Sequence, residues 1–271
     1  MSAGWRLTVR ERPPLRIEVG GLNPQALAAL TLSEVERLPL TMGRKIMPLA
    51  QLFKVEGEPG PRVTFHGSCE RLDGIGRNLA EGEVLVEGDA GHEVGSGQSG
   101  GEIRIAGSVG DEAAAGRSAG VLTVGGNAGA FLGAPKPGER LGMRGGLVQI
   151  ARDVGPRAGD RMRRGMILIG GNAGAACGAR MVAGTIAVAG QLGPKAGIRM
   201  RRGTIIARSA PDGPPDTFAE TGHADLTIFK LLARRLAEAA PWLPLLLADR
   251  PVWRAVGDLA VDGRGELLLT G

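Results

Sequence analysis

Apolar residues and glycines recur along the middle of the chain with a period of about 19 residues, and a fixed period of this length is typical of stacked repeat architectures. Glycines at positions 82, 101, 120, 146, 165, 184 and 203 mark the starts of successive units. The intervals between these positions are 19, 19, 26, 19, 19 and 19. The long interval contains APKPGER at 134–140, which we interpret as a loop insertion.

Each unit predicts one short, half-buried strand. Aliphatic residues occupy the second and fourth positions after the marker glycine, as in Val84 and Val86 or Ile167 and Ile169. This alternation is the pattern of a strand with one buried face. A tight turn, a second short strand and another turn complete the unit, and glycine fills the ninth position of six units, Gly174 among them. We expect these turn glycines to supply φ > 0 and to let one unit lie against the next.

Stacking is required because a single unit is too short to bury its own apolar face. The pattern therefore predicts an all-β fold, a right-handed parallel β-helix with coils of about 19 residues. Two other repeat folds are excluded. A left-handed hexapeptide helix needs coils of about 18 residues, which a 19-residue period does not match, and calcium-binding nonapeptide repeats need Asp at fixed positions, where these turns hold Gly, Ala and Arg. The methionines in the column three residues before the marker are predicted to fill the interior, because Met adapts to irregular gaps, and a metal or cofactor stripe is the alternative. The members of the column are Gln98, Arg117, Met143, Met162, Met181 and Met200.

The flanks do not repeat. Residues 1–62 predict a mixed α/β capping region, with strands around 7–19 and at 51–55, a helix start at Asn23-Pro24 and a capping box formed by Ser33 and Glu36. After the repeat, a Pro- and Asp-rich loop precedes an amphipathic helix over 226–239, N-capped by Asp225. That helix either covers the end of the stack or docks a partner. The expected divisions are 1–62, the Gly-rich repeat domain 63–208, and the C-terminal loop and helix 209–271.

Composition supports a folded repeat protein. Glycine accounts for 46 of 271 residues, while aromatic residues make up 3% and apolar residues 43%. The net charge of +5 is mild, and the basic residues form no long run. The N-terminal segment lacks the apolar region of a signal peptide, and no apolar stretch is long enough to cross a bilayer. We therefore expect a cytoplasmic protein without a membrane partner.

Neither catalytic nor metal-binding residues are expected. GSGQSG at 95–100 matches GxGxxG, but a repeat strand follows it where a dinucleotide-binding motif needs a helix. His66, His92 and His223 are far apart, and His92 is predicted to be an exposed turn residue. Cys69 and Cys177 belong to no CxxC pair and are predicted to be packing residues.

Stacked arginines are the candidate binding residues. The column four residues before the marker holds Arg161, Arg180 and Arg199, and the column two before it holds Arg144, Arg163 and Arg201. Stacking places such side chains about 4.8 Å apart, where like charges repel unless an anion lies across them. Two interpretations stay open. The first is a solvated face or salt bridges to a neighbouring subunit, and the second is contact with an anionic chain or partner. The second would use Arg161, Arg180, Arg199, Arg163 and Arg201. Nucleic acid is not expected, because no aromatic residues interleave with the arginines.

The repeat resembles that of a known family. The segments GSGQSGGEIRIAG, GDRMRRGMILIGG, GARMVAGTIAVAG and GIRMRRGTIIARS resemble the 13-residue repeat of the C subunit of formylmethanofuran dehydrogenase. That repeat has Gly first, Met at the fourth place, Gly at the seventh, then alternating aliphatics and a closing Gly. A similar repeat occurs in the C-terminal β-helix domain of the glutamate synthase large subunit. The resemblance covers about residues 50–207, and the N-terminal flank with RLDGIGRNLAEG favours the dehydrogenase family.

The resemblance implies a non-catalytic scaffold subunit of an enzyme complex. One related complex is the tungsten or molybdenum dehydrogenase of methanogens. The other is the formyltransferase/hydrolase complex of methylotrophic bacteria, which makes formate from formyl-tetrahydromethanopterin through a methanofuran analogue. Richness in Arg, Ala and Gly is typical of a GC-rich bacterial gene and favours the second.

The same resemblance implies that this chain alone binds no cofactor. The methanofuran analogue and the metals would lie on the partners, which are amidohydrolase-like, formyltransferase and dehydrogenase-B-like subunits. The analogue can carry an anionic tail, which the stacked arginines could touch. Three alternatives stay open: the C subunit of a dehydrogenase, a glutamate-synthase-type domain, and an independent β-helix enzyme. The last would carry clustered acids and aromatic residues on one face, whereas none of the three tryptophans lies in the repeat.

Overall fold

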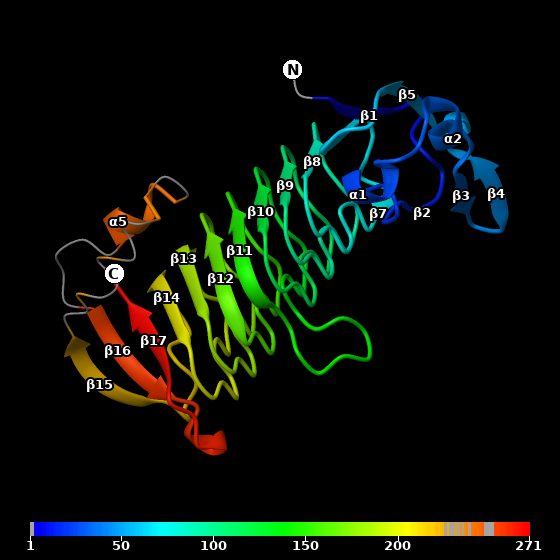
Figure 1. The fold of residues 1–271 in the computed structure, drawn as a ribbon. Coiled ribbons are helices and arrows are strands. Elements are labelled where there is room, and N and C mark those ends of the chain that lie inside the picture. Colours follow the sequence, from blue (N-terminus) through cyan, green and yellow to red (C-terminus); the bar gives the residue numbers. More distant parts are fainter. Residues whose placement is uncertain are drawn as a thin grey trace.

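The computed structural model describes residues 3–224, 227, 231, 234, 236–237, 240–246 and 252–271. Most of the regular structure in these residues is strand, which confirms the β-rich class. The strands form a 13-stranded mixed sheet and a second, 4-stranded sheet. Figure 1 shows the strands of the large sheet side by side along the long axis of the molecule.

The repeat strands form the centre of the large sheet, and each pairs in parallel with the next, as predicted. From β8 to β14, the paired inward residues are one repeat apart, as in Val84 with Ile103, or one repeat plus the insertion apart, as in Leu122 with Val148. These strands are β6 (Arg62–His66), β8 (Glu83–Val86), β9 (Glu102–Ile105), β10 (Val121–Val124), β11 (Arg144–Ile150), β12 (Arg164–Ile169), β13 (Thr185–Gln191) and β14 (Thr204–Ser209).

The second strand predicted for each unit is reduced to one residue. Isolated parallel bridges join Ala90 to Val109 and continue through the stack to Leu192. Beside them, polar side chains take over part of the hydrogen bonding between units. Asp153 Oδ1 accepts the N–H of Asn172 at 2.7 Å, and Asn172 Oδ1 accepts that of Gln191 at 2.9 Å. A short side-chain acceptor here satisfies a backbone donor that a longer strand would have paired.

The interior contains the strand residues and the predicted methionine column. Met143, Met162, Met181 and Met200 are each 0% exposed, which confirms their role as interior filler. Gln98 and Arg117 continue the same column and are equally buried. Two polar side chains therefore lie inside an otherwise apolar stack.

Glycine serves two separate purposes in each unit. The marker glycines are left-handed, with φ of +95° at Gly165 and +108° at Gly184. The expectation of φ > 0 at Gly174 is wrong, because its backbone is not left-handed. A Cβ atom on Gly174 would instead lie 2.7 Å from Pro156 N and 2.8 Å from Gly155 C. Glycine is needed at the ninth position because the backbones of two units touch there.

The N-terminal region adds strands to both sheets. Strand β1 (Gly4–Val9) pairs in parallel with β6 and antiparallel with β5 (Phe53–Gly57). The second sheet runs in the order β4 (Lys45–Pro48), β3 (Pro39–Met42), β2 (Ile17–Glu18) and β7 (Leu72–Asp73). Three short helices complete the region: α1 (Pro24–Leu27), α2 (Leu32–Arg37) and α3 (Leu49–Leu52).

Two local predictions in this region are wrong. The capping box belongs to Thr31 and Glu34, not to Ser33 and Glu36, because α2 begins one residue after Thr31. The strand predicted at 51–55 begins at Phe53, because α3 continues through Leu52. In both places the observed element begins two residues away from the predicted start. Residues of a suitable type occur at both positions, so the sequence pattern alone does not determine where the element begins.

The C-terminal strands continue the sheet beyond the repeat. Strand β17 (Gly265–Leu269) pairs in parallel with β14, while β16 (Val252–Gly257) and β15 (Ala219–Ala224) follow antiparallel. A 3-10 turn, η1 (Leu259–Val261), lies between β16 and β17. The described helices include none that is long and apolar enough to cross a membrane. The helix predicted over 226–239, with Asp225 as its N-cap, lies largely outside the described residues.

A small second core joins the C-terminal segment to the outer face of the large sheet. Helix α5 (Leu243–Leu246) belongs to one buried apolar cluster with the outward side chains of Leu168, Ala187 and Ile206. This segment therefore covers the side of the repeat. The division into 1–62, 63–208 and 209–271 stays a prediction.

The contact at Gly174 predicts a large effect of a side chain. We expect Gly174→Val to destabilise the protein by about 2 kcal/mol, because the new Cβ forces two backbones apart. The control is Gly21→Val, where a Cβ would meet nothing within 4 Å. Thermal unfolding checks both variants, and equal melting midpoints for the two would contradict the contact.

Candidate functional site

The histidines do not come together in the structure. His66 lies on β6 with Nδ1 at 2.6 Å from Glu87 Oε2. His92 lies at a turn, where its Nδ1 accepts the N–H of Asp111 at 2.8 Å. His223 is exposed on β15 near the opposite end of the sheet. In the described part of the chain, no group of three or more His, Cys, Asp or Glu side chains could hold a metal ion.

The cysteines and the GxGxxG segment are explained by packing. Cys69 and Cys177 are buried, and burial raises the pKa of each thiol to about 12. Both stay protonated at neutral pH, so neither is an activated nucleophile. Within GSGQSG, Gly95 and Gly97 are left-handed, and a Cβ on Gly100 would lie 2.0 Å from Ala80 O. Strand β9 follows the segment, as predicted.

Charge is segregated along the repeat. Residues 63–142, which we call the acidic half, contain 11 acidic and 6 basic side chains. Residues 143–208, the basic half, contain 2 acidic and 12 basic side chains. The mild net charge of the whole chain conceals this asymmetry, which is large enough to direct the approach of a charged partner.

Ion pairing follows the same division. In the acidic half, Arg77 pairs with Glu93 at 2.7 Å and Arg104 with Glu102 at 2.7 Å. In the basic half, the pair formed among the described residues is Arg180 with the buried carboxylate of Asp160. Arg180 is therefore held by an ion pair, whereas most neighbouring arginines have no ion-pair partner within the described part of the chain.

The first predicted arginine column is formed at a turn. Arg161, Arg180 and Arg199 occupy equivalent left-handed positions, with φ of +52°, +55° and +58°. The main-chain N–H of Arg161 donates to Ala179 O at 2.9 Å, which links it to the next unit. A left-handed backbone is costly for a residue with a Cβ. We use the name basic edge for the surface at this turn and directly after it that is formed by Arg144, Arg161, Arg163, Arg164 and Arg201.

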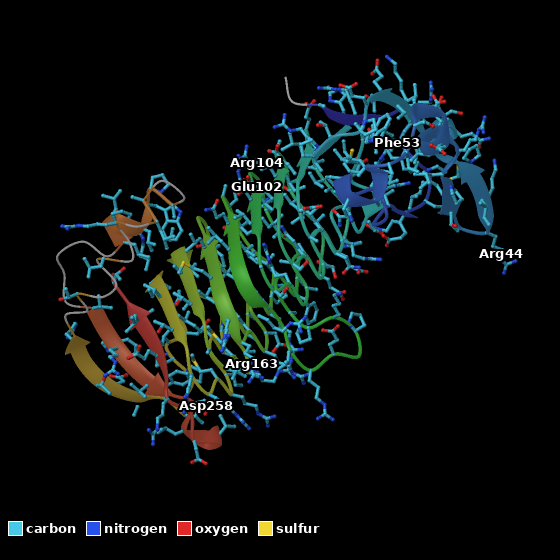
Figure 2. The ribbon with its side chains drawn as sticks, in the orientation of Figure 1. Arg44, Phe53, Glu102, Arg104, Arg163 and Asp258 are labelled. Carbon is cyan, nitrogen blue, oxygen red and sulfur yellow. The ribbon has the colours of Figure 1, made fainter. Side chains whose placement is uncertain are left out.

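The second column extends further than the repeat predicts. Arg144, Arg163 and Arg201 are exposed, and Arg163 lies along the lower margin of the molecule in Figure 2. Arg264 continues the column, because its N–H donates to Arg201 O at 2.7 Å. The sequence repeat could not reveal Arg264, since it belongs to the non-repeating C-terminal region. Arg144 and Arg164 are also direct partners on β11 and β12, an unfavourable pairing of like charges.

Asp258 terminates the basic edge. Its carboxylate is 1% exposed and accepts the N–H groups of Arg199 at 2.7 Å and Ala260 at 2.9 Å. Burial raises the pKa of this carboxyl, but the Thr217 hydroxyl, the two N–H groups and the Arg199 charge together lower it below the ordinary value. Asp258 thus ties the C-terminal region to the last unit.

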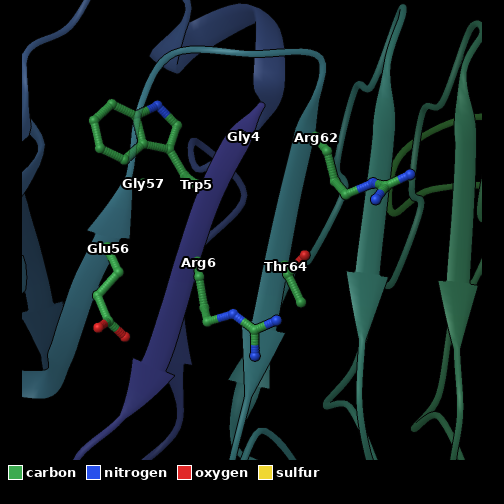
Figure 3. Close-up of a pocket in the computed structure, with 7 residues that line it drawn as sticks. All are labelled: Gly4, Trp5, Arg6, Glu56, Gly57, Arg62 and Thr64. Atoms are coloured by element: carbon green, nitrogen blue, oxygen red, sulfur yellow. The ribbon is translucent and has the colours of Figure 1, made fainter. Parts of the chain in front are cut away.

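Two surface hollows flank the sheet. One, of about 440 Å³, adjoins the basic edge and is lined by Lys195, Arg199 and Asp258 among others. The other, of about 450 Å³, lies over β1, β5 and β6, as Figure 3 shows. There Trp5 is only 1% exposed, and Arg62 pairs with Glu83 at 2.6 Å. The second hollow therefore presents no free aromatic face and no uncompensated Arg62 to a ligand.

Arg117 is the one described arginine inside the stack. Burial lowers the pKa of its guanidinium to about 10. Its Nη2 donates to Ala119 O at 3.1 Å, while Nε and Nη1 have no hydrogen-bond partner among the residues that the structure describes. Gln98, one unit earlier, is better satisfied, because its Nε2 donates to Gly100 O at 2.8 Å and to Gly101 O at 3.1 Å.

Comparison with known proteins gives three informative matches, although no family model matches the chain. A chain of the crystal structure of the formyltransferase/hydrolase complex (FhcABCD) from Methylorubrum extorquens in complex with methylofuran is 37% identical. It has a TM-score of 0.92, and the match covers 98% of this chain and 99% of that one.

Curated relatives match over shorter segments. The C subunit of the formyltransferase/hydrolase complex Fhc of Methylorubrum extorquens is 38% identical over 88 residues, 32% of this chain and 33% of the relative. The C subunit of tungsten-containing formylmethanofuran dehydrogenase 2 of Methanothermobacter marburgensis is 29% identical over 96 residues, 34% of this chain and 36% of the relative. The matched segments thus span about a third of these curated relatives.

The hydrogen bonds of Asp258 predict a pH-dependent contribution to stability. We expect Asp258→Asn to lower the free energy of unfolding by about 2 kcal/mol at pH 7. Because the folded-state pKa lies below the ordinary 3.8, the contribution is complete above that value and disappears as pH falls through the folded pKa. Urea unfolding from pH 7 to about pH 3 should show the two proteins converging. A constant difference would contradict the role of the charge.

The buried guanidinium predicts a stabilising substitution. Arg117→Met continues the methionine column and removes an unpaired buried charge, so we expect unfolding to cost about 1–3 kcal/mol more. Gln98→Met is the control and should destabilise, because Gln98 makes hydrogen bonds that Met cannot replace. Calorimetric melting midpoints check the pair. A lower midpoint for Arg117→Met would reveal a partner for the guanidinium.

Proposed function

We propose that this chain, which belongs to the family formed by the C subunits of formylmethanofuran dehydrogenase and of the formyltransferase/hydrolase complex, is a non-catalytic scaffold subunit of a formyltransferase/hydrolase complex. The observation that carries this proposal is the likeness, over nearly the whole chain, to one chain of the FhcABCD complex. A likeness over this length and at this identity extends to both flanks, so it is not limited to the glycine repeat.

We propose further that the repeat winds as a right-handed parallel β-helix. Parallel pairing of residues one repeat apart supports this arrangement. So do the bridges on the second side of each unit, from Ala90 to Leu192, and the backbone contact at Gly174. A winding of this kind provides a stiff rod whose outward side chains can vary without disturbing the interior.

In the proposed complex this chain holds the other subunits together and the chemistry occurs on them. In the proposed reaction, the formyl group of formyl-tetrahydromethanopterin is transferred to a methanofuran analogue, and hydrolysis by water then releases it as formate. The partners are the amidohydrolase-like, formyltransferase and dehydrogenase-B-like subunits. Two features of the described residues support a structural role. Polar side chains such as Asp153, Asn172 and His92 accept backbone hydrogen bonds, and both thiols are buried and protonated.

A second candidate is the C subunit of a tungsten or molybdenum formylmethanofuran dehydrogenase. The similarity to the tungsten-containing dehydrogenase of Methanothermobacter marburgensis favours it. The hydrolase complex is preferred because the likeness to a chain of the FhcABCD complex covers nearly the whole of this chain and has the higher sequence identity.

Purification of the native complex tests the proposal. The tagged chain, isolated from its source cells, should bring down an amidohydrolase-like subunit and a formyltransferase, and metal analysis should find neither tungsten nor molybdenum. Either of those metals would favour the dehydrogenase. A solitary chain would contradict the scaffold role, and so would formyl-transfer activity in the isolated chain.

A further inference from the structure

The turn that carries the basic edge is covered by the chain itself in the earlier units. In those units, the positions equivalent to Arg161 are occupied by Gly97 and Gly116. A Cβ on Gly97 would lie 2.4 Å from Lys136 Nζ, and one on Gly116 would lie 3.1 Å from Lys136 Cγ. The insertion loop therefore folds back over two units, and glycine leaves the space for it. Figure 1 shows this loop as the green connection from β10 to β11 that extends from the lower margin of the stack.

The loop also brings a carboxylate to the turn. Glu139 Oε2 would lie 3.3 Å from a Cβ on Gly116, and Arg144 Nη2 donates to Gly116 O at 3.3 Å. In these units, an irregular peptide segment thus lies across the turn and brings both Lys136 and Glu139 to it, with the Glu139 carboxylate on the same turn as Arg144.

Beyond the loop the same edge has no such cover from the described chain. Arg161 replaces glycine at a left-handed position, and Arg163 and Arg164 follow it and are exposed. Arg144 and Arg164 are adjacent across two strands, and neither has an ion-pair partner among the described residues. Like charges held this close favour an anion that lies across them.

The chemistry of the edge favours carboxylates carried by a protein. Guanidinium groups bind carboxylates through paired hydrogen bonds, which suits acidic side chains. Stacking with nucleic-acid bases would need free aromatic rings. The ring of Phe131 in this region already lies 5.7 Å from the guanidinium of Arg157.

We propose that the basic edge, formed by Arg144, Arg161, Arg163, Arg164 and Arg201, docks an acidic segment of a partner subunit. The segment lies across the turns of the basic half as the insertion loop lies across those of the acidic half. This inference rests on the proposed function, because the partner is taken to be a subunit of the same complex.

The test compares two triple variants in the purified complex. Arg161→Gly/Arg163→Ala/Arg164→Ala removes three charges from the edge and restores glycine at a left-handed position, so folding should be retained. The control, Arg6→Ala/Arg16→Ala/Arg104→Ala, removes three exposed arginines that are ion-paired within the chain. Melting midpoints establish that both variants fold.

Dissociation of the partners is then measured against NaCl concentration. We expect the edge variant to bind the partners about tenfold more weakly than the wild type, with a shallower salt dependence, and the control to match the wild type. Equal affinity of all three proteins overturns the inference but leaves the proposed function intact. Failure of the wild type to retain any partner overturns the proposed function itself.

Zero-length carbodiimide crosslinking identifies the occupant. Lys136 and Lys195 lie on either side of the edge, in the loop and beside Arg199. We expect them to crosslink to Asp- or Glu-rich peptides of a partner subunit. Crosslinks to Glu93 or Glu112 of a second copy would overturn the choice of partner, and so would co-purifying nucleic acid that the edge variant loses. The choice of partner would also be overturned if the methanofuran analogue alone prevented the crosslinking of Lys136 and Lys195.

Discussion

Contact between the backbones of successive units is the constraint on which this structure depends. At Gly174 the neighbouring main chain is so close that a single Cβ would lie 2.7 Å from it. The contact recurs once per unit, so every unit must have the same path and the same length. Where an insertion occurs, it leaves as a loop, and the strands on either side pair in register again at Leu122 and Val148. The interior columns follow from the same constraint, since each unit supplies one side chain to each column.

That regularity separates the positions that hold the fold from those that are free to vary. Inward residues and turn glycines are confined to a few types, whereas outward positions carry very different charges in the two halves. The acidic half contains ion pairs such as Arg104 with Glu102, and two of its turns are covered by the insertion loop. The basic half is compensated mainly at Arg180 and at Asp258. A rod with one such edge is well suited to bind other proteins while its interior stays unchanged.

Much of the fold could be predicted from sequence, because it is encoded once per unit. The marker glycines, the alternating strand residues and the methionine column recur in successive units, and the insertion interrupts that recurrence. Each of these features could therefore be recognised by comparing one unit with the next. At position 174 the predicted close approach of two units is confirmed and the predicted left-handed backbone is wrong, since either cause alone selects glycine. Features that occur once were also missed. Arg264 joins a column from outside the repeat, and Asp258 binds the backbone of Arg199 across 59 residues of sequence. The fold of the insertion loop over Gly97 depends on tertiary contacts that no local pattern records.

Removal of one unit tests most directly whether the units are equivalent and in register. Deletion of residues 165–183 takes out one whole period, and deletion of residues 165–182 takes out one residue fewer. If the units are equivalent, the longer deletion leaves every later strand with its apolar face inward, whereas the shorter one turns those faces outward. Circular dichroism and thermal unfolding should then show cooperative melting for the longer deletion and none for the shorter. Equal behaviour of the two deletions would contradict the claim that a common unit, repeated in register, holds the molecule together.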